Sequence, residues 1–151
     1  LKKNIARVVL LRKGSVETFG RKSEVEVTKD IVLKNDSAEI EIIYCVKNTG
    51  KSSVDSRFGV EVNLFLKAKN FGKISELKLK KSLNIVDEWT GTRVDFRFDR
   101  NTDIWAFELE TVSDSESGLE RTYQELSLMF LWDISLEPKE EFNVRINKGI
   151  K

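Results

Sequence analysis

Histidine is absent from this 151-residue chain, and cysteine occurs only once, at Cys45. Without histidine there can be no Ser/His/Asp or Cys/His catalytic group, and one cysteine cannot complete a zinc site of the usual Cys/His type. A single cysteine also cannot form an internal disulfide. Cys45 stands between Tyr44 and Val46 in an apolar segment, so we expect a packed, unreactive thiol.

Long apolar runs and an excess of either charge are also missing. No run approaches the roughly 20 residues that span a bilayer, and no signal-peptide core occurs, so we expect a cytoplasmic protein. The 26 Lys and Arg residues nearly balance the 25 Asp and Glu residues. This balance gives no reason to expect nucleic acid or an anionic membrane as a partner. The 34% of charged residues is compatible with a heat-adapted source.

The length predicts one domain over residues 1–151, because a chain of this size can bury a sizeable core. It has no internal repeat, no linker rich in Pro, Gly or Ser, no Walker loop and no dinucleotide fingerprint. Because the chain opens on Leu1, we expect a fragment or an accessory domain of a larger enzyme.

Strict alternation of apolar and polar residues dominates what is present. Polar turns separate the alternating segments every ten residues or so, which is typical of a twisted antiparallel β-sandwich, an all-β fold. We expect strands over residues 24–33, 38–47, 58–66, 92–99, 104–110, 123–136 and 142–146, with turns at 35–37, 48–53, 99–103 and 137–140. Residues 71–89 fit both a strand and a short helix, and we favour the strand.

The expected turn at residues 99–103 decides which side chains of the following strand face inward. Before the turn, Val94, Phe96 and Phe98 share one apolar face. After it, the alternation predicts Trp105, Phe107 and Leu109 as the next inward face. Trp132 is also expected in the core, among Leu126, Leu128, Phe130, Ile134 and Leu136.

Acidic residues supply two candidate sites. A turn at residues 113–117 would bring Glu110 and Glu116 together, and glycosidases use carboxyl pairs roughly 5–10 Å apart. Asp99, Asn101 and Asp103, with Glu110 eleven residues after the first, reproduce four oxygen ligands of a calcium loop. The glycine of that loop is replaced by Ile104, and a hairpin turn explains the same residues without a metal. In a chain so rich in charge, both acidic sets also fit solvated surface.

Trp89 is the candidate for an exposed aromatic, because it precedes the loop glycine Gly91. Sugar rings stack on exposed tryptophan as other apolar faces do, although an aromatic at a turn more often fills a gap in packing.

Four segments resemble the C-terminal β-sandwich of family 57 glycoside hydrolases. The most specific is Glu110-Thr111-Val112-Ser113-Asp114-Ser115-Glu116-Ser117-Gly118, which continues Trp105-Ala106-Phe107-Glu108-Leu109. The others are Phe58-Gly59-Val60-Glu61-Val62-Asn63-Leu64, Asp87-Glu88-Trp89 and Tyr123-Gln124. The resemblance implies a supersandwich like that of galactose mutarotase. It also implies a parent α-amylase or 4-α-glucanotransferase, whose catalytic glutamate and aspartate lie in a separate (β/α)₇ barrel.

What the resemblance implies for this chain is a non-catalytic accessory domain that packs beside the barrel and shapes its cleft. The expected partners are that barrel, as domain or subunit, and α-glucan, with no cofactor apart from the calcium considered above. A stand-alone carbohydrate-binding module and an immunoglobulin-like interaction domain are the alternatives. The residues predicted to contact a ligand or a neighbouring domain are Trp89, Glu110, Ser113, Asp114, Ser115 and Glu116.

Overall fold

The computed structural model describes residues 5–18, 20–35, 37–68, 71, 74–115 and 118–151, and its regular elements in these ranges are all strands. Among these residues no helix is long and apolar enough to cross a bilayer. The strands are β1 (Ile5–Thr18), β2 (Arg21–Lys34), β3 (Glu39–Asn48), β4 (Val54–Leu64), β5 (Ile74–Val86), β6 (Arg93–Ser115), β7 (Gly118–Leu136) and β8 (Glu141–Ile150).

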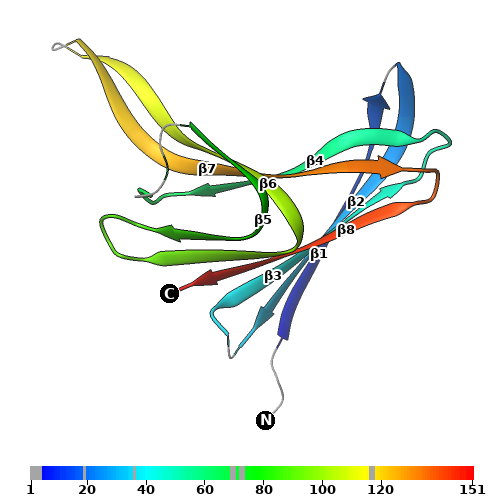
Figure 1. Ribbon diagram of the computed structural model, residues 1–151, viewed down its shortest axis with the longest axis horizontal. Coiled ribbons are helices and arrows are strands. Elements are labelled where there is room, and N and C mark those ends of the chain that lie inside the picture. The colour runs from blue at the N-terminus through cyan, green and yellow to red at the C-terminus, as the bar shows by residue number, and fades with distance from the viewer. Residues whose placement is uncertain (1–4, 19, 36, 69–70, 72–73, 116–117) are drawn as a thin grey trace.

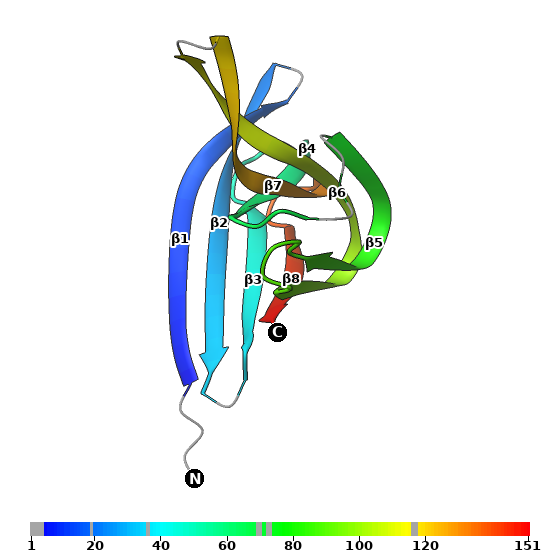
Figure 2. The same cartoon turned by 90° about the vertical axis from the view of Figure 1, so that its left-hand side faces the viewer.

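All eight strands belong to one antiparallel sheet, in the order β1-β2-β3-β8-β6-β7-β4, with β5 paired to β6 off this path. β6 pairs with β8 through residues 94–98 and with β7 through residues 103–115. The sheet therefore folds over where β5 and β6 bend, and its two halves form two layers (Figures 1 and 2). The predicted antiparallel β-sandwich is confirmed.

β6 bends where the sequence predicts a turn, at residues 99–103, but the strand does not end there. Lys80 of β5 pairs with Thr102 and Ser82 pairs with Arg97, which leaves four residues of β6 opposite one residue of β5. Such an excess on one strand is a bulge, which bends the strand and increases its twist. The predicted turn is therefore wrong: its Asp and Asn residues build a bend within one long strand.

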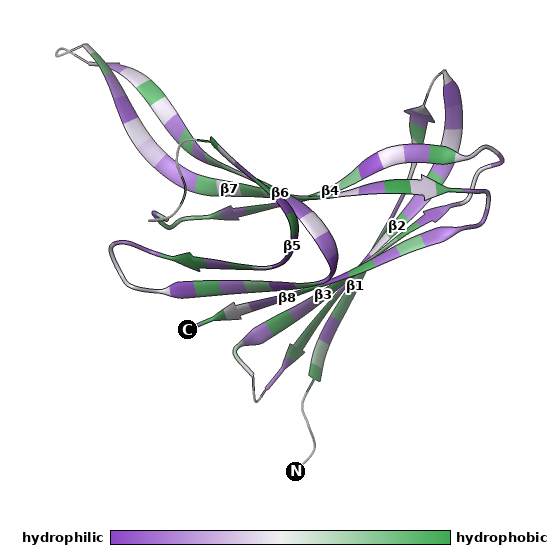
Figure 3. Ribbon diagram, viewed as in Figure 1, coloured by the Kyte–Doolittle hydropathy of each residue, from purple (hydrophilic) through white to green (hydrophobic). Residues whose placement is uncertain are grey.

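The core lies between the two layers and is dominated by aromatic contacts. Phe96 and Phe98 of one layer pack edge-on against Phe130 of the other, with ring centroids 5.1 and 4.8 Å apart. Tyr44 and Phe58 make a further edge contact at 5.6 Å. Figure 3 shows the alternation of apolar and polar residues that this packing requires along most strands.

Most predicted inward faces are confirmed. In β7 the side chains of Leu126, Leu128, Phe130, Trp132, Ile134 and Leu136 are all buried. Residues 74–86 form a strand, as favoured over the helix. Residues 49–53 and 137–140 connect strands, as expected.

The inward face predicted after the bend of β6 is wrong. Ile104 and Ala106 are fully buried, whereas Trp105 is 41% exposed and Leu109 lies at the surface. Because β6 continues unbroken, the even-numbered residues are the buried ones on both sides of the bend, with exposed Arg100 as the exception at the bend itself.

Strand β1 was not predicted. It pairs with β2 along its whole length, and no strand of the described residues pairs with its other edge. Val8, Val9, Leu10 and Leu11 are each exposed by more than half. Because both faces of β1 lie at the surface over residues 5–15, nothing imposes an alternation there that a sequence pattern would reveal.

Candidate binding surfaces

The acidic segment that the sequence singled out forms the end of a long hairpin. Residues 110–115 continue β6 and residues 118–124 begin β7, and this hairpin projects away from the sandwich at the upper left of Figure 1. Of the turn predicted at residues 113–117, residues 113–115 are paired strand, and residues 116 and 117 lie outside the described residues. In the ladder Ser113 lies opposite Glu120, Asp114 opposite Leu119, and Ser115 opposite Gly118.

Contacts across the hairpin hold its strands together and leave apolar side chains outside. Arg121 Nη1 lies 3.3 Å from Glu110 Oε2, so the carboxylate of Glu110 already has a cationic partner. Glu116, its predicted acidic partner, lies outside the described residues. Val112 is 55% exposed and Leu119 is 77% exposed. The hairpin thus offers a projecting, partly apolar surface.

Trp89 lies at the turn between β5 and β6 and is 69% exposed, as the sequence suggested. Asp87 organises this turn: its carboxylate accepts hydrogen bonds from the backbone N–H of Lys67 at 3.0 Å and from the hydroxyl of Thr90 at 2.6 Å. These bonds, the Thr90 bond foremost, lower the pKa of Asp87. The turn is therefore fixed while the indole of Trp89 stands free of the core.

The predicted calcium ligands lie along the bend of β6, and two of them already accept hydrogen bonds. Asp99 Oδ1 accepts the backbone N–H of Arg145 at 2.9 Å, and Asp103 Oδ1 accepts that of Leu79 at 3.0 Å. In the part of the chain that the structure describes, no group of three or more His, Cys, Asp or Glu side chains is arranged to hold a metal ion. The calcium hypothesis for Asp99, Asn101 and Asp103 therefore gains no support from the geometry.

Cys45 is half-buried on the outward side of β3. The expectation that it packs in the core is therefore wrong. Burial, followed by the carboxylate of Glu141, raises the pKa of the thiol. Because the thiolate is the reactive form, this environment keeps Cys45 a weak nucleophile, as predicted.

The sequence reasoning missed a surface on the layer formed by β4, β7, β6 and β5, on the side that faces away from the core. Ladder partners lie side by side, and residues two apart on a strand share a face. Gly59, Leu131 and Asp103 therefore form one row, and Met129 and Trp105 lie in the next. This outer face consists of Arg57, Gly59 and Glu61 of β4, Glu76 and Lys78 of β5, Asp103 and Trp105 of β6, and Met129, Leu131 and Asp133 of β7.

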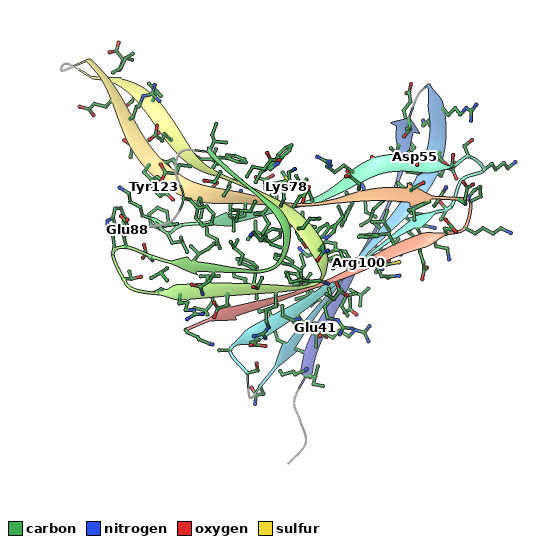
Figure 4. All side chains as sticks on the ribbon, viewed as in Figure 1. Glu41, Asp55, Lys78, Glu88, Arg100 and Tyr123 are labelled. Atoms are coloured by element: carbon green, nitrogen blue, oxygen red, sulfur yellow. The ribbon has the colours of Figure 1, made fainter. Side chains whose placement is uncertain are left out.

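Charged side chains of the outer face form two bonded groups, an Arg57–Asp133 pair and a network around Lys78. Arg57 binds Asp133 through two hydrogen bonds of 2.6 and 3.1 Å. Lys78 Nζ lies 2.5 Å from Glu76 and 3.1 Å from Asp103. Figure 4 labels Lys78 on this layer.

Trp105 belongs to the same network, because its indole N–H donates to Glu76 Oε1 at 3.0 Å. Hydrogen bonds from Lys78 and then from Trp105 lower the pKa of Glu76. For Asp103 the backbone N–H of Leu79 is the main cause of a lowered pKa, with Lys78 adding to it. The carboxylates of Glu76 and Asp103 therefore stay ionised at neutral pH and accept hydrogen bonds.

A cavity of about 280 Å³ adjoins the outer face at the bend of β6. Asp103, Leu131 and Asp133 line it from the outer face, and Arg100 lines it from the bend. Arg100, labelled in Figure 4, donates to the carbonyl of Asn143 and lies 4.9 Å from the ring centroid of Phe142. Counting the period of two across the bend, from Phe96 and Phe98 to Ile104 and Ala106, is the signal that would have placed Trp105 here.

Similarity to solved structures supports the fold. The crystal structure of 4-alpha-glucanotransferase from Thermococcus litoralis matches 97% of this chain and 22% of its own, with a TM-score of 0.77 and 24% identity. A putative aldose 1-epimerase from Escherichia coli matches 96% of this chain and 65% of its own, with a TM-score of 0.65 and 10% identity. The expected likeness to the galactose mutarotase type of sandwich is confirmed.

Sequence comparison identifies the family. Alpha-amylase 1 of Dictyoglomus thermophilum is 26% identical over 138 residues, covering 83% of this chain and 20% of the relative. An alpha-amylase of Pyrococcus furiosus is 27% identical over 125 residues, covering 83% and 18%. The chain thus spans about a fifth of the length of these curated relatives. The family model described as alpha-amylase/4-alpha-glucanotransferase, C-terminal, matches residues 1–146. The chain therefore belongs to the family of C-terminal domains of alpha-amylases and 4-alpha-glucanotransferases.

Proposed function

We propose that this chain is a single non-catalytic accessory domain of an enzyme that hydrolyses or transfers α-1,4-glucan, located in the cytoplasm. It packs beside a catalytic (β/α) barrel, as domain or subunit, and shapes the cleft of that barrel. The observation that carries the proposal is the family match over residues 1–146, to a C-terminal region of amylases and glucanotransferases. The relatives named above are about five times longer than the part that this chain matches, which leaves room for a catalytic domain in them.

The ionisation of the carboxyl groups supports a non-catalytic role. Glycoside hydrolysis requires a carboxylic acid whose pKa is raised, so that it can protonate the leaving group. Throughout the described ranges, every carboxyl group with a displaced pKa is displaced downward, by hydrogen bonds and cationic partners. These groups are Asp30, Glu76, Asp87, Asp95, Asp103 and Asp133.

The projecting β6–β7 hairpin is the part that we expect to meet the barrel. Its end extends beyond the sandwich, so it can reach a neighbouring domain without exposing the core (Figure 1). Val112 and Leu119 supply exposed apolar contact area, and Glu110, bound to Arg121, supplies a fixed polar group. Partly apolar surface surrounded by polar residues is typical of contacts between domains.

One observation favours the alternative of a stand-alone carbohydrate-binding module. Trp89 is 69% exposed at a turn that Asp87 holds rigid, and a fixed exposed indole suits stacking on a sugar ring. In that case the chain would bind glucan without any barrel, and Trp89 would carry the contact.

Gene context and activity test the proposed function. We expect the gene to encode, or to neighbour, a (β/α) barrel with glutamate and aspartate catalysts. The 151-residue chain incubated with maltoheptaose should leave the distribution of chain lengths unchanged, whereas a protein that includes the barrel should redistribute it. Redistribution by the 151-residue chain alone would overturn the non-catalytic assignment.

Binding between the chain and that barrel tests the role of the hairpin. Leu119→Asp should weaken the association measured by titration calorimetry, because it places a charge in the apolar contact. Ile5→Asp is the matched control, since Ile5 is similarly exposed, on β1 and away from the hairpin. Equal affinity of both variants would show that the hairpin is not the contact.

A further inference from the structure

We propose that the outer face around Trp105 binds a chain of α-1,4-linked glucose. The class of sugar rests on the proposed function, whereas the location rests on the geometry of the face. Trp105 is the platform, Met129 and Leu131 form an apolar floor beside it, and the paired charges at the edges supply hydrogen bonds.

Gly59 keeps the floor flat. It lies opposite Leu131 in the ladder, and a Cβ atom built on Gly59 would meet Leu131 Cδ2 and Met129 Sδ, each at 3.3 Å. The two side chains therefore lie close over the backbone of β4, and Leu131 is only 7% exposed although it points away from the core. Trp105 rises beside this floor in the same row as Met129.

The indole of Trp105 is held in place before any ligand arrives. Its N–H donates to Glu76 at 3.0 Å, and Glu76 is itself bound by Lys78. With 41% of the side chain exposed, an aromatic surface is available for the apolar faces of sugar rings. A fixed platform avoids part of the entropy that a mobile side chain loses on binding.

Hydrogen-bonding groups surround this platform on two sides. Asp103 and Glu76 share Lys78, and Asp133 forms a two-bond pair with Arg57. Each carboxylate oxygen has more than one acceptor position, and the cations keep further N–H donors, so sugar hydroxyls can join these pairs without breaking them. The adjoining cavity of about 280 Å³ is near the lower end of the range for small-molecule sites.

The composition of the face favours a sugar over a protein partner. Centres of protein interfaces are depleted in Lys, Glu and Asp, because these groups lose hydration when a partner covers them. Here Lys78, Asp103 and Asp133 lie between or beside the apolar side chains. A neutral, hydroxyl-rich ligand can stack on the apolar surface and replace water at the charged groups.

Titration of the 151-residue chain with maltoheptaose tests the proposal. Trp105→Ala should weaken binding at least about tenfold, because the stacking surface is lost. Trp105→Phe should retain part of the affinity, since it keeps a ring but loses the bond to Glu76. Trp89→Ala tests the competing site of the carbohydrate-binding alternative. Phe65→Ala is the matched control: Phe65 is also an exposed aromatic, beyond the end of β4, and this variant should bind like the parent. Thermal melting of each variant checks that it folds.

The outcomes separate this proposal from the proposed function. Maltoheptaose binding that survives in Trp105→Ala, or that disappears in Trp89→Ala alone, overturns the outer-face site and leaves an α-glucan role intact. Binding of cellohexaose in place of maltoheptaose overturns the glucan class, and the proposed function with it. If the parent chain binds neither sugar, the site is overturned. It is also overturned if Trp105→Ala weakens only the association with the barrel and leaves sugar binding unchanged. In both cases the accessory role would remain.

Discussion

The layer formed by β4, β7, β6 and β5 has two faces of different chemistry. The inner face is mostly apolar, and Leu128, Phe130 and Ile104 on it are completely buried, together with the polar Thr102. The outer face alternates apolar side chains with ion pairs, and it leaves Trp105 41% exposed. Adjacent residues of one strand thus serve two purposes: even-numbered residues of β6 and β7 stabilise the sandwich, and odd-numbered residues form a surface suited to binding.

This difference means that stability and binding can be altered separately. Phe130→Ala should lower the free energy of unfolding by about 3–5 kcal/mol, because the fully buried ring packs against both Phe96 and Phe98 and its removal leaves a cavity. Met129→Ala, one residue earlier and on the outer face, should cost only about 1 kcal/mol, since that side chain is half-buried. Urea denaturation measures both, and equal losses would show that the two faces are packed alike.

The inner face was predictable because burial imposes a period of two on the sequence. Phe96 and Phe130 were placed inside from alternation alone, and both are buried. The strand assignment of residues 74–86 also followed from this period. The core is thus encoded locally, one residue in two, wherever a strand faces the other layer.

The outer face was not predictable, because it depends on β6 passing through a bend. Asp99, Asn101 and Asp103 have the composition of a turn, yet their partners lie on other strands: Arg145 N–H bonds to Asp99 and Leu79 N–H to Asp103. The residues next to Asp99 and Asp103 in the sequence do not indicate these distant partners. Assuming a turn shifted the alternation by one residue and placed Trp105 in the core.

The strands of the hairpin at residues 110–118 were not predicted, for a related reason. Its polar and acidic residues resemble a loop, but paired strands that project beyond the core need no apolar face. The predicted contact residues Glu110, Ser113 and Asp114 do lie together at this projecting end, near Ser115 in the ladder. Their role in contacting a ligand or a domain stays a prediction.

A buried polar side chain at the end of β3 allows a second comparison, between a buried and an exposed asparagine. Asn48 is fully buried, and its side chain donates to the carbonyls of Ser52 and Leu136 and accepts from Ser23 and Gly50. Asn48→Ala should lower the free energy of unfolding by roughly 3 kcal/mol, because these buried partners lose their bonds.

Asn63, exposed on β4, provides the control for this variant. Asn63→Ala should change the free energy of unfolding by less than about 0.5 kcal/mol. Urea denaturation of both variants at neutral pH makes the comparison. A loss at Asn48 no larger than at Asn63 would show that the hydrogen bonds of Asn48 contribute nothing beyond those it makes with water when unfolded.

The smallest expected effect is on the pH dependence of stability, through the carboxylate of Asp103 on the outer face. The pKa of Asp103 is lowered in the folded state, first by the N–H of Leu79 and then by Lys78. Its contribution to stability is therefore complete above the ordinary aspartate pKa of about 3.9, and it is lost as pH falls through the lowered folded value. Asp103→Asn should make the fall in stability between pH 5 and pH 2 less steep, as measured by urea denaturation at several pH values.

Salt separates the two causes of this acid sensitivity. At 1 M salt the Debye length is about 3 Å, so the attraction of Lys78 for Asp103 is largely screened, whereas the short hydrogen bond from Leu79 persists. The difference in slope between the parent and Asp103→Asn should therefore shrink at high salt without vanishing. Complete loss of the difference would make Lys78 the main cause, and the network of the outer face would then depend on charge alone, with no contribution from the backbone of β5.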